Sequence, residues 1–348
     1  MLKTLKDFSV AGKRVLVRCD FNVPVDEKGN IKDDFRIKRT LPTIKYLIEN
    51  KAKIILMSHL DPESTGVVDK KFTMNKIAER LSELLYMSIA KEDDCIGPEV
   101  EALSDSLESG QVLLLENLRF YKEETGNNLE FAEKLSYLGD VYVNDAFSVC
   151  HRNHASITGI IGFMEGCVGL LLEKEITALD KIMQNSEKPM VSIVGGTKVE
   201  TKSKFIDNIS QIADTVLVSG LIKKEIDEKN IQLKHPEKIM GPVGDLGALD
   251  INKESIKIFV EKIIAAKTVV WNGPFGKFEE KKYAKGTLAI AKAIAESGAY
   301  SVVGGGETIE FLEKQGIIDK FSHVSTGGGA MLAYLSGDKL PGLVALAE

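Results

Sequence analysis

The sequence predicts an α/β fold with two doubly wound, mostly parallel sheets, and three observations predict it. Short apolar runs alternate along the chain with segments whose apolar residues have helical spacing, which is the pattern of βαβ units. The chain of 348 residues is longer than one hydrophobic core usually grows, so two domains are expected. A long helical segment, 171–184, followed by Pro189, separates the two halves. We therefore place the domains at 1–172 and 187–330, with an interdomain helix at 173–186.

The composition argues against several classes of partner. Hydrophobic residues make up 44% and charged residues 28% of the chain, as in ordinary soluble globular proteins. A net charge of −6 argues against nucleic acids and anionic membranes as partners. The N-terminal residues MLKTLKDF lack the apolar core of a signal sequence, and the most apolar stretch, Ile160–Leu172, is too short to span a bilayer. Any phosphate site must then be a local basic pocket.

The cysteines indicate a reducing compartment. Cys19, Cys95, Cys150 and Cys167 lie far apart and form neither a CxxC pair nor a zinc-ligand spacing. Such cysteines are typical of reduced thiols that fill the core of a cytosolic protein. We expect a cytoplasmic protein.

Each strand expected in the first half ends in polar residues. These strands are Arg14–Arg18, Lys53–Met57, Val112–Leu115 and Val141–Val143. In doubly wound sheets, ligands bind beyond the carboxyl ends of the strands. The polar residues that follow the strands, or lie in neighbouring basic segments, are Asp20, Asn22, Arg36, His59, Arg119 and Arg152. Loops are polar for solvation alone, but six such residues together predict a pocket for a small carboxylate or phosphate ligand with hydroxyl groups.

His151 and His154 leave a second interpretation to weigh. Their i, i+3 spacing suits a metal ion, but no third Cys, His or acidic ligand lies nearby in the sequence. Arg152 lies between them. The segment therefore favours anion binding over metal binding.

Every strand expected in the second half runs into glycine. These strands are Met190–Val194, Thr215–Val218, Thr268–Trp271, Ser301–Val303 and His323–Ser325. Glycine allows the backbone to approach a ligand closely, and polyphosphate is the usual ligand of a rim of backbone N–H groups. The first of these turns, Gly195-Gly196, precedes Lys198 and Lys202, which lie four apart on one helix face. The same turn would also let a helix pack on its strand, and a lone Gly-Gly-x-Lys does not decide between the two uses.

Two acidic residues of this half suit a nucleotide site. Glu307 has the chemistry to hold a divalent cation together with phosphate oxygens, although an acidic residue is equally favoured by the dipole at a helix N-terminus. Glu279 could accept hydrogen bonds from ribose hydroxyls.

With these residues assembled, the chain resembles the phosphoglycerate kinase family nearly from end to end. The segments that carry the resemblance are GKRVLVRCDFNVP (12–24), DDFRI (33–37), LPTIKYL (41–47), LLLENLRFYKEE (113–124), GDVYVNDAF (139–147), HRNHAS (151–156), GGTKV (195–199), TVVWNGPFGKFE (268–279), VGGGET (303–308) and HVSTGGGA (323–330).

The resemblance implies two Rossmann-like domains that face each other across a cleft. The first domain would bind 3-phosphoglycerate or 1,3-bisphosphoglycerate, and the second would bind ADP or ATP with Mg²⁺. The C-terminal segment, 331–348, would return to the first domain. The activity implied is reversible phosphoryl transfer by a monomer. The carboxylate acceptor is already ionised at neutral pH, so the reaction needs aligned cations rather than a general base.

Carried over motif by motif, the resemblance assigns three sets of residues. The acid substrate would be bound by Asp20, Phe21, Asn22, Arg36, His59, Arg119 and Arg152. The nucleotide would be bound by Gly195, Gly196, Lys198, Lys202, Asn272, Gly273, Pro274, Glu279, Gly305, Gly306, Glu307 and Thr308, with the metal on Glu307. The transferred group would be stabilised by Arg36, Lys198 and the backbone around Gly328.

The chain departs from the family pattern at three places. The family's SHLGRP is Ser58–Pro62 here, without the arginine. The glycine- and methionine-containing segment expected after Val218 is not recognisable, and the chain is some tens of residues short before Ala248. The aspartate of GGGD is Glu307.

Two other functions remain to be weighed against the kinase. A catalytically weak module that binds nucleotides or phospho-ligands would not need both halves of a transfer site, so the retained Arg36, Lys198 and Lys202 argue against it. A Rossmann dehydrogenase is disfavoured because no GxGxxG follows the first strand.

Overall fold

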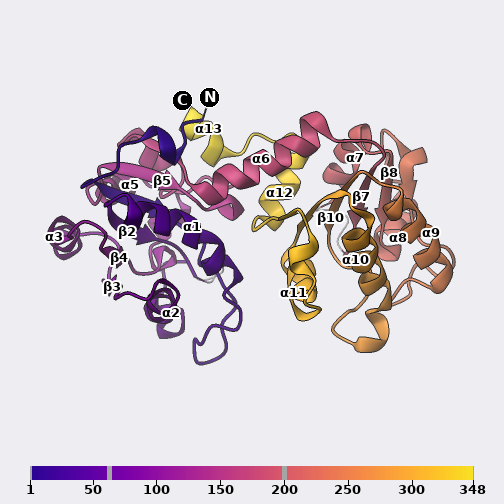
Figure 1. The fold of residues 1–348 in the computed structure, drawn as a ribbon, viewed down its shortest axis with the longest axis horizontal. Coiled ribbons are helices and arrows are strands. Elements are labelled where there is room, and N and C mark those ends of the chain that lie inside the picture. The colour runs from indigo at the N-terminus through magenta and orange to yellow at the C-terminus, as the bar shows by residue number, and fades with distance from the viewer. Residues whose placement is uncertain (1, 61–64, 198–201, 348) are drawn as a thin grey trace. The chain divides into compact units, whose positions relative to one another are not determined.

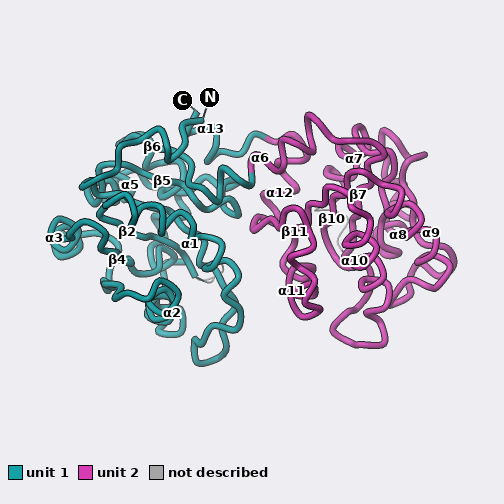
Figure 2. The backbone as a smooth tube through the Cα atoms, in the orientation of Figure 1, with its two compact units in different colours: residues 1–175, 339–348 teal, residues 176–338 magenta. Residues whose placement is uncertain are grey.

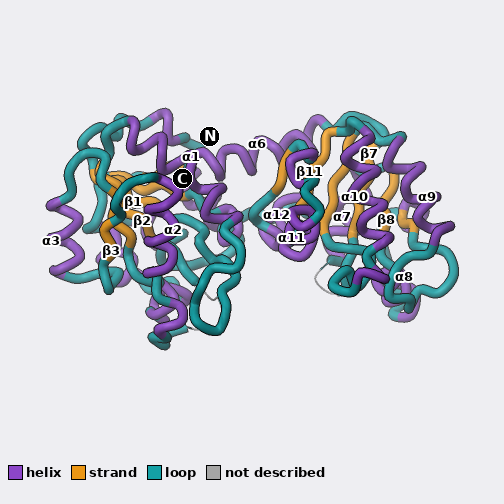
Figure 3. The backbone as a smooth tube through the Cα atoms, turned by 60° about the horizontal axis from the view of Figure 1, so that its bottom comes forward, coloured by secondary structure: helices purple, strands orange, loops and turns teal. Residues whose placement is uncertain are grey.

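The structure is a computed structural model that describes residues 2–60, 65–197 and 202–347. The chain divides into two compact units (Figures 1 and 2). Unit 1 comprises residues 1–175 and 339–348, and unit 2 comprises residues 176–338. Each unit contains a six-stranded parallel sheet with helices packed against it (Figure 3), so the expected α/β fold with two doubly wound domains is confirmed. Of the segment expected to return to the first domain, residues 339–348 belong to unit 1 and residues 331–338 to unit 2.

The strand order in unit 1 is β3-β4-β2-β1-β5-β6. Its strands are β1 (Arg14–Arg18), β2 (Lys53–Met57), β3 (Ala90–Lys91), β4 (Val112–Leu114), β5 (Val141–Asn144) and β6 (Gly166–Val168). Its helices are α1 (Phe35–Glu49), α2 (Asn75–Leu85), α3 (Pro98–Ser106), α4 (Lys122–Thr125), α5 (Leu129–Ser136) and α13 (Pro341–Ala347).

The sheet of unit 1 is buried on both faces because its strands alternate between two hydrophobic clusters. Val15 and Val17 of β1 belong to a cluster with Ile37 of α1 and other residues of α1 and α2. Leu16 points to the opposite face and packs in a cluster with residues of α3 and α5, including Phe131. Burial on both faces explains why these strands read as continuous apolar runs.

The strand order in unit 2 is β12-β11-β10-β7-β8-β9. Its strands are β7 (Met190–Val194), β8 (Thr215–Val218), β9 (Ile239–Met240), β10 (Thr268–Asn272), β11 (Tyr300–Gly304) and β12 (His323–Val324). Its helices are α7 (Ser203–Ile212), α8 (Gly220–Glu228), α9 (Lys253–Ile264), α10 (Lys285–Ser297), α11 (Gly306–Lys314) and α12 (Gly328–Leu335). No helix in the described part of the chain has the length and apolar character to span a bilayer.

Helix α6 (Leu170–Asn185) begins in unit 1 and continues into unit 2. Its first turn is fixed by Asp145, whose Oδ1 accepts hydrogen bonds from the N–H groups of Leu171 at 3.0 Å and Leu172 at 3.2 Å. Gly169 leaves room for this carboxylate, since an added Cβ there would lie 2.2 Å from Asp145 Oδ1. Burial raises the pKa of Asp145 to about 7, although the hydrogen bonds from Thr43, Leu172 and Leu171 oppose the shift.

This pKa predicts that Asp145 makes folding stability depend on pH. The native state retains the proton up to about pH 7, whereas the unfolded chain loses it near pH 4. The contribution of Asp145 is therefore fully present below about pH 4 and is lost as the pH rises to 7. Between pH 5 and pH 8 it should lower the free energy of unfolding by roughly 3 kcal/mol. Urea denaturation at pH 5 and pH 8 measures this change in the free energy of unfolding. The change should be smaller for Asp145→Asn than for the wild type. An equal change in both proteins would contradict the raised pKa of Asp145.

Candidate active site

A cluster of cationic side chains, called here the cationic cluster, lies at the carboxyl end of the sheet in unit 1. From β1 the chain proceeds outward through β2 and then returns to the other side of β1 at β5. The boundary between the neighbouring strands β1 and β5 is therefore the topological switch point of this sheet. Ligands of doubly wound sheets bind at the carboxyl ends of the strands at such a point. Arg18 is the last residue of β1, and its side chain is fully buried.

His59 lies in the cationic cluster as a neutral imidazole. It follows β2 and is 2% exposed, and Arg18 Nη2 lies 3.1 Å from its Nδ1. Burial holds the pKa of His59 well below its ordinary value, and the charges of nearby arginines lower it further; these are Arg18, Arg119, Arg152 and Arg36. Because the guanidinium can only donate, Nδ1 accepts and the proton lies on Nε2. His59 can therefore donate a hydrogen bond to an anion.

Arg36 is held at the edge of the cationic cluster by Asp20. Arg36 Nη1 lies 3.0 Å from Asp20 Oδ2 and donates to the carbonyl oxygen of Asn22 at 3.1 Å. Asp20 is buried and also accepts a hydrogen bond from Ser148 Oγ. The Arg36 side chain keeps 31% of its surface exposed, so the guanidinium is oriented and still accessible to a ligand.

The buried carboxylate of Glu124 lies next to this group of arginines. Glu124 is fully buried, and its two oxygens accept hydrogen bonds from the Oγ and N–H groups of Ser156 at 2.6 and 2.9 Å. Ser156 Oγ in turn accepts from Arg18 Nε at 2.8 Å, and Arg18 Nη2 lies 3.9 Å from Glu124 Oε1. Arg18 thus lies near Glu124 and Arg36 pairs with Asp20, whereas the charges of four arginines act on His59. The excess positive charge suits an anionic ligand.

The structure brings together in the cationic cluster most of the residues predicted for a small-ligand pocket. Arg119 is buried, and the pKa of Arg152 is lowered by burial and then by Arg18, despite the opposing effect of Asp20. Phe21 differs, because its side chain belongs to the hydrophobic core and only its N–H is polar, donating to Ser58 Oγ at 2.8 Å.

Sequence reasoning missed Arg18, Glu124 and Ser156, although one signal was present. A charged residue at the end of an otherwise apolar buried strand needs a partner, and Arg18 is such a residue. His154 completes the buried group, with Nδ1 3.7 Å from Glu124 Oε1. Burial and the neighbouring arginines lower its pKa to about 3.

The described residues contain no cluster of three or more His, Cys, Asp or Glu side chains placed to hold a metal ion.

In unit 2, β7 and β10 form the switch point, and their glycine turns contact each other directly. The N–H of Gly195 donates to the carbonyl oxygen of Asn272 at 2.9 Å, and that of Gly196 donates to Pro274 at 2.8 Å. A Cβ added at Gly195 would lie 2.2 Å from the carbonyl oxygens of Gly273 and Pro274, so no side chain fits. Only glycine allows these two backbones to approach so closely.

Several other predicted residues surround this turn. The Lys202 ammonium donates to the carbonyl oxygen of Gly195, and burial lowers the pKa of Lys202 while Glu307 opposes the shift. Thr308 Oγ1 accepts from the N–H of Gly273 at 3.0 Å. Lys198, predicted as a catalytic residue, lies outside the described residues.

Two helices begin at one glycine-rich corner beside Asn272. Helix α11 begins at Gly306 and α12 at Gly328, and a Cβ added at Gly328 would lie 3.4 Å from the Cα of Gly305. An added Cβ at Gly305 would lie 3.2 Å from Asn272 Nδ2. Helix N-termini carry partial positive charge and unpaired N–H groups, so this corner favours an anion.

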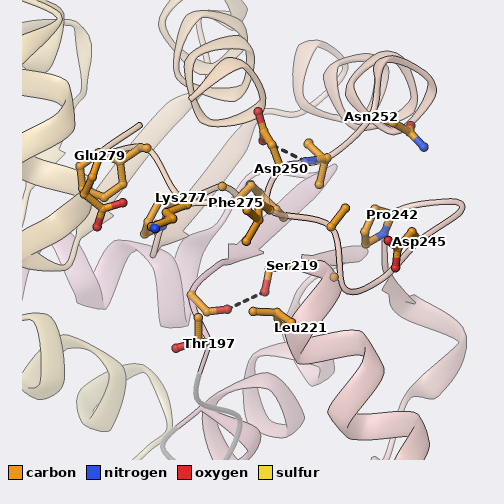
Figure 4. Close-up of a pocket in the computed structure, with 18 of the residues that line it drawn as sticks. Thr197, Ser219, Leu221, Pro242, Asp245, Asp250, Asn252, Phe275, Lys277 and Glu279 are labelled. Carbon is orange, nitrogen blue, oxygen red and sulfur yellow. Dashed lines mark hydrogen bonds between the residues drawn. The ribbon is translucent and has the colours of Figure 1, made fainter. Parts of the chain in front are cut away.

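A cavity of about 430 Å³ opens from the same rim (Figure 4). The predicted residues that line it are Gly196, Pro274, Glu279 and Glu307. Sequence reasoning missed the rest of its wall, which comes from the start of α8, from the segment 242–252 and from the residues after Pro274. Its volume is that of a small-molecule site, and its lining combines apolar side chains with a few polar groups.

Fold and site together define the class of the protein. One doubly wound unit carries a cluster of side chains with excess positive charge, and the other carries a cavity bordered by glycine turns and helix N-termini at its switch point. Such a pair of sites is that of an α/β phosphotransferase acting on small molecules.

Comparison with known proteins identifies the family within this class. The family model described as phosphoglycerate kinase matches residues 5–230 and 224–338. Phosphoglycerate kinase of Pelotomaculum thermopropionicum is 41% identical, with 99% of each chain covered, and that of Chlorobium phaeobacteroides is 41% identical with the same coverage. The solved structure of phosphoglycerate kinase from Pyrococcus horikoshii superimposes with a TM-score of 0.87 at 34% identity, covering 100% of this chain and 98% of that one. The chain belongs to the phosphoglycerate kinase family.

The same comparisons show where this chain is short. The alignment with the Pelotomaculum relative extends over 391 positions, whereas this chain has 348 residues, so several tens of residues of that relative have no counterpart here. The two matches to the family model meet at residues 224–230. The missing residues therefore fall near the end of α8, and β9 lies between this place and the segment 242–252 that lines the cavity.

Proposed function

We propose that this protein catalyses reversible phosphoryl transfer between 1,3-bisphosphoglycerate and ADP, giving 3-phosphoglycerate and ATP. The observation that carries the proposal is the cationic cluster of unit 1, in which the charges of four arginines act on neutral His59. Its excess positive charge fits the carboxylate and phosphate of the acid substrate. The relatives, 40–42% identical and all named phosphoglycerate kinase, do not favour a binding module without catalysis.

The residues of unit 1 would bind and orient the acid. The guanidinium groups of Arg119 and Arg152 would bind anionic oxygens, and His59 would donate through Nε2. Arg36, oriented by Asp20, would stabilise the charge of the transferred phosphoryl group. No group needs to act as a general base, because the attacking carboxylate is already ionised.

The residues of unit 2 would bind the nucleotide. The phosphates would lie near Lys202 and against the corner formed by Gly305 and Gly328, where two helix N-termini offer backbone N–H groups. The N–H groups of Gly195 and Gly196 already donate to Asn272 and Pro274. Lys198 belongs to this proposal by its motif alone. Glu279, on the cavity wall, would accept from the ribose.

A magnesium ion fits the residues of this cavity. Mg²⁺ is usually held by one or two carboxylates together with substrate phosphates, and the exposed carboxylate of Glu307 lines the cavity. When bound, the ion would neutralise phosphate charge.

The test is a coupled assay of 3-phosphoglycerate phosphorylation by the purified protein with Mg²⁺ and ATP, repeated with GTP. Turnover of about 1–100 s⁻¹ or faster is expected, as for ordinary kinases. A folded protein that turns over neither nucleotide would contradict the proposal and favour the binding module.

The missing arginine after His59 gives a second test of the acid site. Asp61 lies outside the described residues, at the place where the family pattern has glycine and arginine. One additional charge-assisted hydrogen bond is worth about 1.5–3 kcal/mol. Asp61→Arg should therefore lower the KM for 3-phosphoglycerate by about tenfold or more, while Asp61→Asn should not. An unchanged KM would mean that another cation already fills this role.

We also propose a cytoplasmic location. All four cysteines are buried and unbridged, as expected in a reducing compartment. One relative, from Volvox carteri, is named as chloroplastic. The monomeric state remains a prediction.

A further inference from the structure

We propose that Ser148 is a positioning residue for phosphoryl transfer: its hydroxyl fixes the carboxylate of Asp20, and Asp20 in turn directs the guanidinium of Arg36. The inference rests on the proposed function, in which Arg36 stabilises the transferred phosphoryl group. Ser148 lies in the turn after β5, Asp20 follows β1, and Arg36 lies in the first turn of α1. The contact therefore joins three elements at the switch point of unit 1.

The turn that carries Ser148 is held firmly. Phe147 and Val149, on either side of Ser148, have buried side chains, whereas the Ser148 side chain is half-buried. The N–H of Val149 donates to the Ala146 carbonyl at 3.1 Å, and that of Cys150 donates to the Phe147 carbonyl at 3.0 Å. The Ser148 hydroxyl is therefore a donor with a fixed origin.

The carboxylate of Asp20 has a protein donor on each oxygen. Asp20 is 1% exposed, and its Oδ1 accepts from the N–H of Asn22 at 3.1 Å. Its Oδ2 accepts from Ser148 Oγ. A hydrogen bond from a hydroxyl to a carboxylate is charge-assisted and strong. The two donors together fix the plane of the carboxylate.

This plane decides which guanidinium Asp20 pairs with. Arg36 Nη1 lies 3.0 Å from Oδ2 and 3.2 Å from Oδ1 of Asp20. The charge of Asp20 also acts on Arg152, whose pKa it raises, against the lowering by burial and by Arg18. A buried carboxylate that is free to turn could share itself between the two cations. The hydroxyl of Ser148 holds it on Arg36.

The pairing fixes the direction of the remaining donors of Arg36. Its Nη1 lies at Asp20 and also donates to the Asn22 carbonyl at 3.1 Å, and among the described residues these contacts use Nη1 alone. A guanidinium is rigid and planar, so two acceptors at Nη1 set where Nε and Nη2 point. In-line phosphoryl transfer depends on such alignment, and a small rotation of the group lowers the rate.

The test is Ser148→Ala, which removes only the hydroxyl, in steady-state kinetics with ATP and 3-phosphoglycerate. The kcat should fall by about tenfold, and the KM for ATP should not change. Ser136→Ala is the matched control. Ser136 is a half-buried serine of the same unit, its hydroxyl donates to the Glu133 carbonyl within α5, and its loss should leave kcat unchanged.

A double-mutant cycle shows whether Ser148 acts through Arg36. If it does, adding Ser148→Ala to Arg36→Ala should lower kcat no further, because the group that Ser148 positions is already absent. The same fold loss in both backgrounds would show a general structural role and would overturn the inference.

Two other results would also overturn it. An unchanged kcat in Ser148→Ala would mean that Asn22 alone fixes Asp20. A raised KM for 3-phosphoglycerate with an unchanged kcat would mean that Ser148 contributes to substrate binding and not to the alignment of Arg36. In each case the wild type is active, so the proposed function stands. A folded wild type without turnover would refute the proposed function and this inference with it.

Discussion

Replacing Arg36 by alanine is expected to lower kcat by about 10²–10³-fold, because in the proposed function Arg36 is a preorganised donor to the transferred phosphoryl group. The ion pair with Asp20 and the bond to the Asn22 carbonyl hold the guanidinium in one direction. A lysine at this position would keep the charge but lose the planar fork, so Arg36→Lys should recover only part of the rate. Steady-state kinetics with saturating ATP and 3-phosphoglycerate measures both variants.

The affinity for ATP should not change in Arg36→Ala, since Arg36 belongs to unit 1 and the nucleotide is proposed to bind in unit 2. Arg39→Ala is the matched control. Arg39 lies on the same helix, where its guanidinium stacks on the ring of Phe35 at 4.7 Å, and its loss should leave kcat nearly unchanged. A parallel loss of ATP affinity in Arg36→Ala would contradict the assignment of one ligand to each unit.

The sequence predicted the long strands of both sheets because each is a continuous apolar run ending in polar or glycine residues. It did not predict β3 and β9, which have two residues each, too few to show a periodicity; β12 is as short and was expected because a glycine-rich turn follows it. It also missed β6, which lies inside an apolar stretch where a strand and a helix cannot be distinguished.

The candidate site shows the same limit. His59 and Arg119 could be found from the sequence because they follow strands, and Arg36 because it lies in a basic segment. Glu124 and Ser156 could not, because their role is to neutralise and orient Arg18 across a distance of 106 residues or more in the chain. The part of the cavity wall that comes from the segment 242–252 was equally hidden, since it depends on where a loop lies in the fold.

The glycine turns of unit 2 lead to the second large effect, which concerns stability. Gly195→Ala should destabilise the protein by about 3 kcal/mol or more, because the new Cβ would lie 2.2 Å from two backbone carbonyl oxygens that cannot turn aside. The only tryptophan, Trp271, donates from its ring to the Gly273 carbonyl at 2.8 Å and so reports on this contact. Urea denaturation followed by its fluorescence should show a clear fall in the midpoint.

The matched control for this experiment is Gly306→Ala, at the same corner of unit 2. A Cβ added at Gly306 would have no heavy atom within 4 Å, and the backbone of Gly306 is helical. The free energy of unfolding should therefore change by no more than about 0.5 kcal/mol. The contrast separates steric exclusion at the β7–β10 turn from any general intolerance of alanine in glycine-rich loops. An equal midpoint for Gly195→Ala and the wild type would mean that the two turns can move apart, and the close backbone approach would then not be what fixes the phosphate end of the cavity.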